Sequence, residues 1–503
     1  MGLVTPVDPV PVSELGRVHF TAIGGAGMSG IARIMLARGV VVSGSDQVAS
    51  PLLEELAAAG ARVRVGHAAA NLGDADTLVV STAIRPDNPE LVEARRRGLR
   101  VLHRAAALAS VMLGYQGIAV AGTHGKTTTT SMITTLLRHC GAAPSYVIGG
   151  ILAETGLGAE QAAGRQFVIE ADESDGSFLM FSPDAAVVTS VEADHLDNYG
   201  SLTAIEAAFE AFANRITTGG LLLAGADDPG ARALAGRVRA DVTALTYGIA
   251  EDADYRVTDI RPRGMRTSLT VAGGPRTVLG RPVAGDTATA GSSTTRTGTG
   301  PSLPVQLEIS VPGRHNALNA AAAFGLCVQL GVPVADAVAG LAAYRGARRR
   351  MELVGEADGV QVIDSYAHHP TELAADLAAA REVAQGGRVI AVFQPHLFSR
   401  TRIFAAEFAA ALGAADEALV LDVYAAREDP EPGVTGRLIS DAVPGGRAIF
   451  VPDRTSVPAA IASLAKPGDL VLTMGAGDVT ALGPRIVAAL RERAGWQRET
   501  GQQ

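Results

Sequence analysis

The first part of the chain alternates short apolar runs with helical stretches and glycine-rich turns. Residues 19–23 predict a strand, residues 28–38 predict a helix, and residues 40–43 and 78–81 predict two further strands. Strands and helices in regular succession are typical of a parallel sheet with helices on its faces. We therefore expect an α/β unit that ends near residue 113.

The same pattern begins again at residue 117 and then changes. An apolar strand is predicted at residues 118–121, before a helix at residues 128–138. Further buried strands are predicted at residues 167–169, 187–191 and 221–223. Three later runs look like antiparallel strands, at residues 255–260, 267–271 and 305–311. Between the last two, about residues 280–303 are rich in Gly, Thr, Ala, Ser and Pro and have almost nothing to bury, which predicts a disordered extension.

The last third of the chain predicts a second open α/β domain. Its strands are expected at residues 361–364, 389–393, 417–423 and 470–474, with Ala-rich helices between them. A chain of 503 residues is too long for one core. The pattern divides it into three α/β domains, at residues 1–115, 116–345 and 346–503.

Composition narrows the class of protein. No run of about 18 uncharged apolar residues is present, so no membrane span is expected. The net charge of −9 argues against nucleic-acid binding. Cys140 and Cys327 lie in apolar helical contexts and are expected to be buried free thiols, consistent with a reducing compartment. Residues 1–17 lack the apolar core of a signal peptide, so a cytoplasmic location is expected.

The rarest charged residue marks the first candidate site. The chain has 43 Lys plus Arg but only two lysines, and Lys126 stands in Gly-Thr-His-Gly-Lys-Thr-Thr at residues 122–128. This run follows a predicted strand and opens a helix, so backbone N–H groups and a compact ammonium can converge on a phosphate. The common nucleotide loop would need Gly where Val120 stands. The alternative is a solvated surface lysine.

Two acidic segments follow neighbouring predicted strands. Glu170 opens Glu-Ala-Asp-Glu-Ser-Asp, and His195 lies in Glu-Ala-Asp-His-Leu-Asp at residues 192–197. Ligands bind at the carboxyl ends of parallel strands, and carboxylates suit Mg²⁺. Both segments are therefore metal-site candidates, with Thr127 as a further hydroxyl ligand. The alternatives are a helix-capping acidic loop and a histidine with a structural role.

A glycine turn after the first strand is a second nucleotide signal. Residues 25–30 match Gly-x-Gly-x-x-Gly, and Asp46 follows about twenty residues later. The combination predicts a Rossmann-like first domain whose helix N-terminus holds a diphosphate. Glycines for tight packing are the alternative. The fold class expected is thus a Rossmann-like N-terminal domain, a central P-loop ATPase-type α/β domain with antiparallel strands, and a C-terminal open α/β domain.

Taken together, these motifs resemble the Mur ligase family. The resemblance also rests on residues 313–319, 368–372 and 393–402, and the motifs keep the family's order over about residues 18–480. It is strongest to the branch that joins L-alanine to UDP-N-acetylmuramate. It implies an ATP-dependent amide-bond ligase of peptidoglycan synthesis, in which ATP converts the muramyl carboxylate to an acyl phosphate that the amine of L-alanine attacks. Mg²⁺ is implied, with two ions expected and Mn²⁺ as a substitute, and the enzyme is expected to be a monomer or weak homodimer.

The resemblance also implies the roles of individual residues. Catalytic roles fall to Lys126, His195, His368 and Arg400. ATP contacts fall to Gly122, Thr123, His124, Gly125, Lys126, Thr127, Thr128, His315 and Asn316. Contacts to the UDP substrate fall to Gly25, Ala26, Gly27, Met28, Ser45, Asp46, Ser81 and His396. The metal ligands implied are Thr127, Glu170 and His195, and Tyr366 is expected near the alanine.

Three departures from the family's pattern bear on these expectations. The chain has no lysine between residues 127 and 465, so the carbamoylated lysine of ligases that add later residues is impossible here, as in the alanine-adding branch. Leu397 stands where some members have Arg, and Asp364-Ser365 replaces an acidic pair. The nearest rival is a recycling ligase that attaches a preformed peptide. A nicotinamide-dependent dehydrogenase would leave the Lys126 loop unexplained, and the full set of metal ligands argues against a non-catalytic ATP-binding regulator.

Overall fold

The computed structural model describes residues 3–274, 304–426 and 428–500. The predicted extension at about residues 280–303 lies outside the described residues. Contacts divide the chain into two compact units. The first comprises Met1–Thr258, Thr270–Leu307 and Leu318–Tyr344. The second comprises Asp259–Leu269, Glu308–Ala317 and Arg345–Gln503. The three domain boundaries predicted from the sequence stay predictions.

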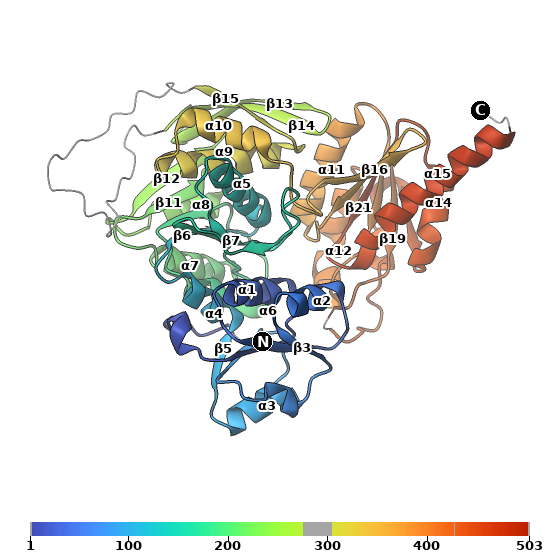
Figure 1. The fold of residues 1–503 in the computed structure, drawn as a ribbon. Coiled ribbons are helices and arrows are strands. Elements are labelled where there is room, and N and C mark those ends of the chain that lie inside the picture. Colours follow the sequence, from blue (N-terminus) through green and yellow to red (C-terminus); the bar gives the residue numbers. More distant parts are fainter. Residues whose placement is uncertain (1–2, 275–303, 427, 501–503) are drawn as a thin grey trace. The chain divides into compact units, whose positions relative to one another are not determined.

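The first unit opens with a parallel sheet of five strands in the order β3-β2-β1-β4-β5 (Figure 1). Its strands are β1 (Val18–Thr21), β2 (Val42–Asp46), β3 (Arg62–Val65), β4 (Thr77–Val80) and β5 (Arg100–His103). Its helices are α1 (Ala26–Ala37), α2 (Pro51–Ala58), α3 (Pro89–Arg96) and α4 (Arg104–Met112). The predicted strands correspond to β1, β2 and β4. The strand order reverses between β1 and β4, which is where open α/β sheets bind ligands.

The second sheet of this unit has a parallel centre and an antiparallel flank. Among the described residues it holds ten strands in the order β15-β14-β13-β12-β11-β10-β6-β9-β7-β8. Its bounds are β6 (Gln116–Ala121), β7 (Ser145–Val147), β8 (Ala159–Glu160), β9 (Gln166–Glu170), β10 (Ala185–Val188), β11 (Leu221–Gly225), β12 (Thr243–Gly248), β13 (Tyr255–Arg263), β14 (Arg266–Gly273) and β15 (Val305–Ile309). Neighbouring β13 and β14 are joined by only two residues, so they form a hairpin as expected. The prediction placed the end of β10 too late, because the strand stops at Val188.

Helices cover the central sheet. They are α5 (Lys126–His139), α6 (Leu196–Tyr199), α7 (Leu202–Ala213), α8 (Pro229–Ala235), α9 (Arg314–Gln329) and α10 (Val334–Ala343). Helix α10 packs against α5, the helix that follows the lysine loop. Cys327 on α9 is a buried free thiol as predicted, whereas Cys140 after α5 is partly exposed. In the described part of the chain, no helix has both the length and the apolar character that a membrane crossing needs.

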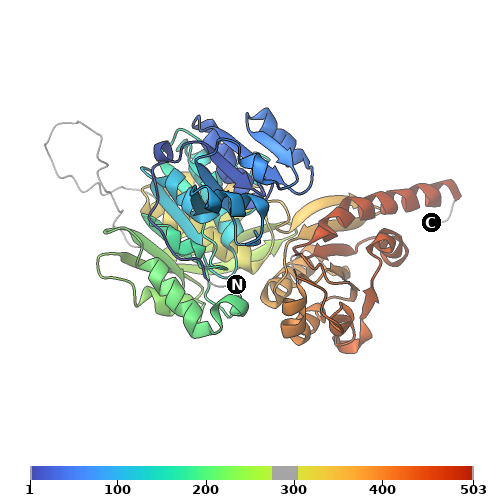
Figure 2. The same ribbon diagram turned by 90° about the horizontal axis from the view of Figure 1, so that it is seen from below.

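The second unit contains a mostly parallel sheet in the order β16-β17-β21-β18-β19-β20. Its strands are β16 (Glu352–Ala357), β17 (Val360–Ser365), β18 (Val389–Phe393), β19 (Glu417–Leu421), β20 (Ala448–Val451) and β21 (Leu470–Met474). Its helices are α11 (Pro370–Ala384), α12 (Phe398–Leu412), α13 (Arg437–Ser440), α14 (Val457–Leu464) and α15 (Leu482–Thr500). Successive residues of β17 point to opposite faces of the sheet and belong to separate cores. Ile363 packs with α11 and α12, and Val362 packs with α14 and α15. Figure 2 shows α15 as the long helix that ends this unit.

Candidate active site

The lysine loop leads from the buried strand β6 into α5, the arrangement that the sequence predicted. Gly122 has φ +131° and Gly125, the residue before the helix, has φ +79°. The ammonium of Lys126 donates hydrogen bonds to the carbonyl of Gly122 at 2.6 Å, to the carbonyl of Thr123 at 3.2 Å and to Oε1 of Glu173 at 2.8 Å. The lysine thus lies folded over its own loop, beside the helix N-terminus where an anion would bind.

The two loop glycines leave no room for a side chain. A Cβ on Gly122 would lie 2.1 Å from Oγ1 of Thr189, and a Cβ on Gly125 would lie 2.6 Å from Oδ1 of Asn319. Both glycines also hold backbone conformations that side-chain-bearing residues rarely adopt. The loop can therefore pack this closely against Thr189 and Asn319 only because these positions are glycine.

Charge around Lys126 keeps its ammonium protonated. Burial disfavours the charged form, but the carboxylates of Glu173, Glu170 and Asp172 outweigh it and raise the pKa of Lys126. Burial also raises the pKa of Glu173 to about 7, although the ammonium beside it opposes this. The sequence analysis assigned no role to Glu173, although this residue lies in the acidic segment that Glu170 opens and that was predicted as a metal site.

The structure brings two predicted metal ligands together. The hydroxyl of Thr127 donates to Oε1 of Glu170 at 3.1 Å, and the backbone N–H of Gly149 donates to Oε2 at 2.8 Å. The third, His195, has φ +53° before α6, and its Nε2 lies 3.9 Å from Oε1 of Glu173, the carboxylate that pairs with Lys126. Within the described ranges, no group of three or more His, Cys, Asp or Glu side chains is arranged to hold a metal ion.

Other loop residues connect to the segment after β10. The backbone N–H of Thr123 donates to the carbonyl of Ser190 at 3.0 Å, and its hydroxyl accepts from the N–H of Glu192 at 2.8 Å. His124 lies with Nε2 3.5 Å from Oε2 of Glu192. Thr128 is buried in the first turn of α5. The lysine loop and the second acidic segment therefore form one hydrogen-bonded structure.

The glycine turn of the first sheet lies at the predicted place. Gly25 precedes α1, so Gly25, Ala26, Gly27 and Met28 surround the N-terminus of that helix. The backbone N–H of Gly24 donates to Oδ2 of Asp46 at 2.9 Å, so this aspartate holds the turn. Ser81 follows β4 and therefore lies across the strand-order reversal from the turn.

A buried carboxylate that the sequence did not reveal lies beneath this turn. Glu90 on α3 is fully buried, and its Oε2 accepts hydrogen bonds from the hydroxyls of Thr21 and Ser45, both at 2.8 Å. Its Oε1 accepts from Asn71 at 2.8 Å, and His19 lies 3.4 Å away. Burial would raise the pKa of Glu90, but these hydrogen bonds outweigh it and lower the pKa to about 2. Ser45, predicted as a substrate contact, is itself buried in this cluster, and its substrate role stays a prediction.

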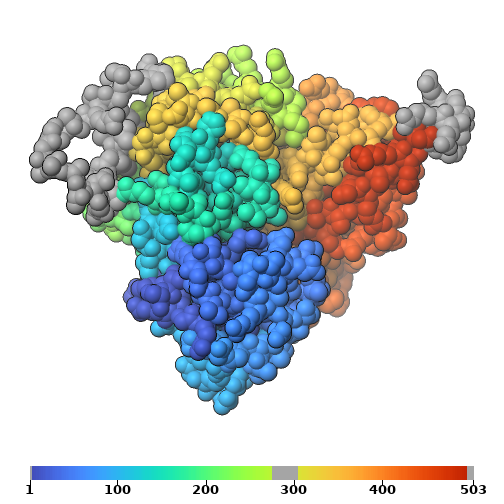
Figure 3. Space-filling model, in the orientation of Figure 1, coloured from blue at the N-terminus to red at the C-terminus, as the bar shows by residue number. Residues whose placement is uncertain are grey.

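Polar contacts join the two sheets of the first unit at the acidic segment. Arg104, the first residue of α4, donates to Oδ2 of Asp172 at 2.6 Å, and the hydroxyl of Thr82 donates to Oδ2 of Asp175 at 3.2 Å. Helix α1 also packs against β7 and β8, and the blue and teal residues adjoin in the space-filling view (Figure 3). The glycine turn and the lysine loop are therefore parts of one packed body.

Predicted site residues of the second unit cluster at the carboxyl edge of its sheet. Asp364 is the penultimate residue of β17 and lies 3.2 Å from Nε of Arg349, which also stacks over the ring of Tyr366 at 4.8 Å. Nδ1 of His368 lies 3.0 Å from the carbonyl of Tyr366. Burial lowers the pKa of His368 to about 3, although the nearby Glu372 opposes this, so its imidazole is neutral at neutral pH.

Four rings form a row at this edge. The ring of His368 lies 5.3 Å from that of Tyr366 and 6.1 Å from that of His396, which stacks on Tyr424 at 5.8 Å. Tyr424 follows β19 and was not predicted; an aromatic residue just after a strand end was the available signal. Arg400 is buried in the first turn of α12. Leu397, one of the departures from the family's pattern, directly precedes that helix and has φ +71°.

The two predicted adenine contacts also lie in the second unit. The side-chain amide of Asn316 donates to the carbonyl of Pro312 at 2.7 Å and is buried. Nε2 of His315 lies 3.6 Å from Oδ1 of Asp376 on α11. Burial lowers the pKa of His315 to about 4, so this imidazole is also neutral at neutral pH.

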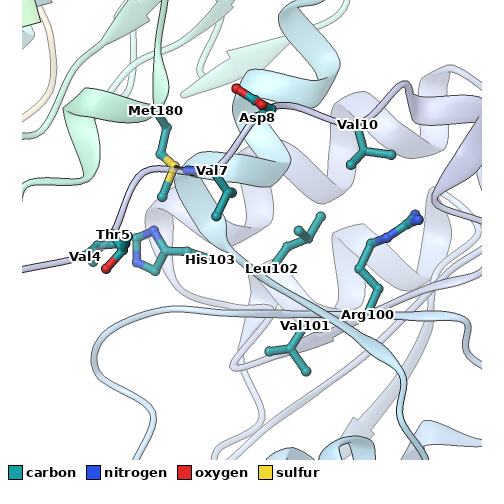
Figure 4. A pocket seen from close by; sticks show the side chains of 10 residues that line it. All are labelled: Val4, Thr5, Val7, Asp8, Val10, Arg100, Val101, Leu102, His103 and Met180. Atoms are coloured by element: carbon teal, nitrogen blue, oxygen red, sulfur yellow. Dashed lines mark hydrogen bonds between the residues drawn. The ribbon is translucent and has the colours of Figure 1, made fainter.

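A pocket of about 350 Å³ lies elsewhere in the first unit, between residues 4–10 and β5 (Figure 4). Val7, Leu102 and Met180 give it an apolar wall, and Arg100 and His103 add charge or polarity. None of the residues predicted to bind nucleotide or substrate lines it.

Comparison with known proteins decides the family. Three family models match in chain order: the Mur ligase family, catalytic domain, at residues 17–116; the Mur ligase middle domain at residues 120–327; and the Mur ligase, glutamate ligase domain, at residues 349–477. The chain belongs to the Mur ligase family. Membership makes it an ATP-dependent ligase that forms amide bonds, as the resemblance of its motifs implied.

Similar Mur ligases cover the whole length. A Thermobifida fusca protein named UDP-N-acetylmuramate--L-alanine ligase is 57% identical over 97% of this chain and 100% of its own. A Kineococcus radiotolerans protein of the same name is 53% identical over 96% and 98%. Among solved structures, a UDP-N-acetylmuramate-alanine ligase from Thermotoga maritima aligns with a TM-score of 0.77 at 29% identity, covering 95% and 99%. The three-domain α/β architecture predicted from the sequence is thereby confirmed.

Proposed function

We propose that this Mur ligase joins L-alanine to the carboxylate of UDP-N-acetylmuramate in peptidoglycan precursor synthesis. The observation that carries the proposal is the Lys126 loop, in which Thr127 and Glu170 lie together beside a glycine-shaped helix N-terminus. The names of relatives at 50–57% identity give the substrates. A murein peptide ligase from Psychrobacter arcticus shares the fold at only 24% identity, so the much higher identity to the L-alanine ligases favours the alanine-adding reaction over peptide recycling.

The reaction would proceed in two steps. A carboxylate oxygen of the muramyl group attacks the γ-phosphorus of ATP, giving an acyl phosphate and ADP. The amine of L-alanine then attacks the acyl carbon, and phosphate leaves as the amide forms. Lys126 would hold the β- and γ-phosphates, because its compact ammonium already lies at the loop carbonyls and can exchange the Glu173 contact for phosphate oxygens.

Thr127 and Glu170 fit a magnesium ion, since a hydroxyl and a carboxylate 3.1 Å apart are the hard oxygen donors it prefers. Mg²⁺ would neutralise phosphate charge there. We propose His195 as a ligand of a second ion, for which Mn²⁺ can substitute. The glycine turn at α1 would hold the UDP diphosphate, and His368, Arg400 and Tyr366 would surround the alanine. The expected cytoplasmic location and the monomeric or weakly dimeric state stay predictions.

The test is ADP release from ATP with UDP-N-acetylmuramate and a panel of amino acceptors. L-Alanine should support turnover, and the product should be the muramyl amide of alanine by mass spectrometry. Glycine, L-serine and a preformed murein tripeptide complete the panel, and Lys126→Ala gives the background. Turnover with the tripeptide but not with L-alanine would replace the proposal with peptide recycling.

A further inference from the structure

A buried carboxylate on α11 lies between two parts of the second unit that the proposed reaction uses. Asp376 is 9% exposed, on the helix face that also buries Leu373 and Leu377 in the core. Its Oδ2 accepts a hydrogen bond from the hydroxyl of Ser365, and its Oδ1 lies 3.6 Å from Nε2 of His315. Acidic side chains are seldom buried this deeply unless they have partners. Here each carboxylate oxygen faces a different functional segment.

The first of these segments is the loop that leads to His368. Ser365 is the last residue of β17 and is 1% exposed. Its hydroxyl donates to Asp376 and accepts from the backbone N–H of Ala367 at 3.0 Å, so it turns the chain at the strand end. Asp376 on α11 is therefore hydrogen-bonded to the end of β17.

The second segment is the turn that carries His315. Gly313 has φ +98°, and a Cβ there would lie 2.7 Å from Cε1 of the His315 ring. The glycine thus allows the imidazole to lie back over its own turn with Nε2 toward Asp376. The histidine side chain is 33% exposed, so the ring is reachable from solvent while its Nε2 faces the buried carboxylate.

We propose that Asp376 is a positioning residue that orients His315 and the loop at residues 364–368 together, and so couples nucleotide binding to amino-acid binding. The inference rests on the proposed function, because that function gives His315 its adenine contact and His368 its alanine contact. A single carboxyl group that is hydrogen-bonded to Ser365 and faces Nε2 of His315 at 3.6 Å can transmit a displacement of one segment to the other, because both contacts involve the same rigid group.

Burial supports the bridging role. It raises the pKa of Asp376 to about 7, although the hydrogen bond from Ser365 opposes this. Near neutral pH part of the population is therefore a neutral acid, which can donate to one partner while it accepts from the other. Glu372 and Arg350 are the other charged groups near this carboxyl.

Single substitutions separate the two halves of the proposal. Asp376→Ala should weaken ATP binding, measured by calorimetry without alanine, and raise the KM for L-alanine, each about tenfold, the cost of an unpaired buried polar group. Asp376→Asn keeps a donor and an acceptor and should stay within about threefold of the wild type. Ser365→Ala should raise the KM for alanine alone. Glu382→Gln removes an exposed carboxylate from the same helix and is the matched control.

A double substitution tests whether Asp376 acts through His315. His315→Ala/Asp376→Ala should bind ATP no more weakly than His315→Ala does, because the partner is already gone. The proposal would be overturned if the double variant lost ATP affinity by the product of the two single losses. It would also be overturned if Asp376→Ala had the same ATP affinity and KM for L-alanine as Glu382→Gln. If Asp376→Ala does not fold, Ser365→Ala and Asp376→Asn decide between the outcomes. A wild-type enzyme that fails to turn over L-alanine would refute the proposed function. The ATP affinities of the two single variants and the double variant would still test whether Asp376 orients His315.

Discussion

Replacing Glu90 by glutamine should loosen the N-terminal sheet of the first unit. Glu90 is fully buried and accepts hydrogen bonds from the last residue of β1, Thr21, and from Ser45 on β2. Glutamine has nearly the same shape but turns one acceptor into a donor, which then faces groups that also donate. The substitution therefore removes the charge and two hydrogen bonds without leaving a cavity.

The size of the effect follows from the pKa of Glu90. The folded protein lowers this pKa from 4.5 to about 2, and a pKa difference of one corresponds to roughly 1.4 kcal/mol. The ionised carboxylate therefore stabilises the folded state by ~3 kcal/mol at neutral pH. A lowered acid pKa means that this contribution is complete above pH 4.5 and declines as the pH falls toward 2.

Hydrogen exchange read by mass spectrometry gives the local measurement. Peptides from β1 and β2 in Glu90→Gln should lose ~3 kcal/mol of protection at pH 7, and peptides from the second unit should not change. The difference in melting temperature between the wild type and Glu90→Gln should become smaller as the pH is lowered from 7 to 3. Glu93→Gln on the same helix is the control, because Glu93 pairs with Arg96 at the surface. The reasoning would be refuted if both variants lost the same hydrogen-exchange protection, or if the difference in melting temperature between wild type and Glu90→Gln did not change with pH.

Three further predictions concern the site. Lys126→Ala should reduce ADP release by about 10³-fold, and Lys126→Arg should not restore it because a planar guanidinium cannot replace the compact ammonium; near-normal turnover by either would remove the phosphate role. His195→Ala should raise the Mg²⁺ concentration needed for half-maximal activity, and an unchanged Mg²⁺ titration would make this histidine structural. His368→Gln should reduce the loss of stability on acidification, because the folded state keeps a neutral imidazole down to about pH 3 while the unfolded chain binds the proton from pH 6.5. Melting temperatures between pH 7 and pH 4 test this, with the exposed His139→Gln as a control that should follow the wild type.

In the first and last sheets the sequence predicted the interior strands and missed the edge strands. In the central sheet it missed the interior strands β7 and β12 but predicted the edge strand β15. β18 and β21 lie inside the sheet of the second unit, and both have the predicted bounds. Such strands are buried on both faces, so they are continuous apolar runs. The strands missed in the first and last sheets were β3, β5, β16 and β20, and each lies at a sheet edge. β3 is Arg-Val-Arg-Val and largely exposed, so its pattern does not distinguish it from a loop.

Local site motifs were predictable, but their distant partners were not. The Lys126 loop could be predicted from the sequence because its strand, glycine turn and helix follow one another directly along the chain. The contact of Arg104 with Asp172 spans 68 residues, and the one between Thr21 and Glu90 spans 69. No spacing rule joins such positions, because only the completed sheets bring them together. Asp376 was missed for the same reason, whereas Tyr424 follows directly after the predicted strand at residues 417–423 and was overlooked.

The scarcity of lysine also makes the protein chemically addressable. Its two lysine side chains differ in exposure: Lys466 is exposed after α14, whereas Lys126 is largely buried and donates three hydrogen bonds, and nearby carboxylates raise the pKa of Lys126. Of these two side chains, an amine-reactive dye should therefore label Lys466 and spare Lys126, while a free α-amino group, with a pKa of about 8, reacts as well. One lysine-directed reaction would then place a fluorophore or a surface tether on the second unit without modifying the Lys126 loop. Most proteins would need cysteine engineering to reach that selectivity.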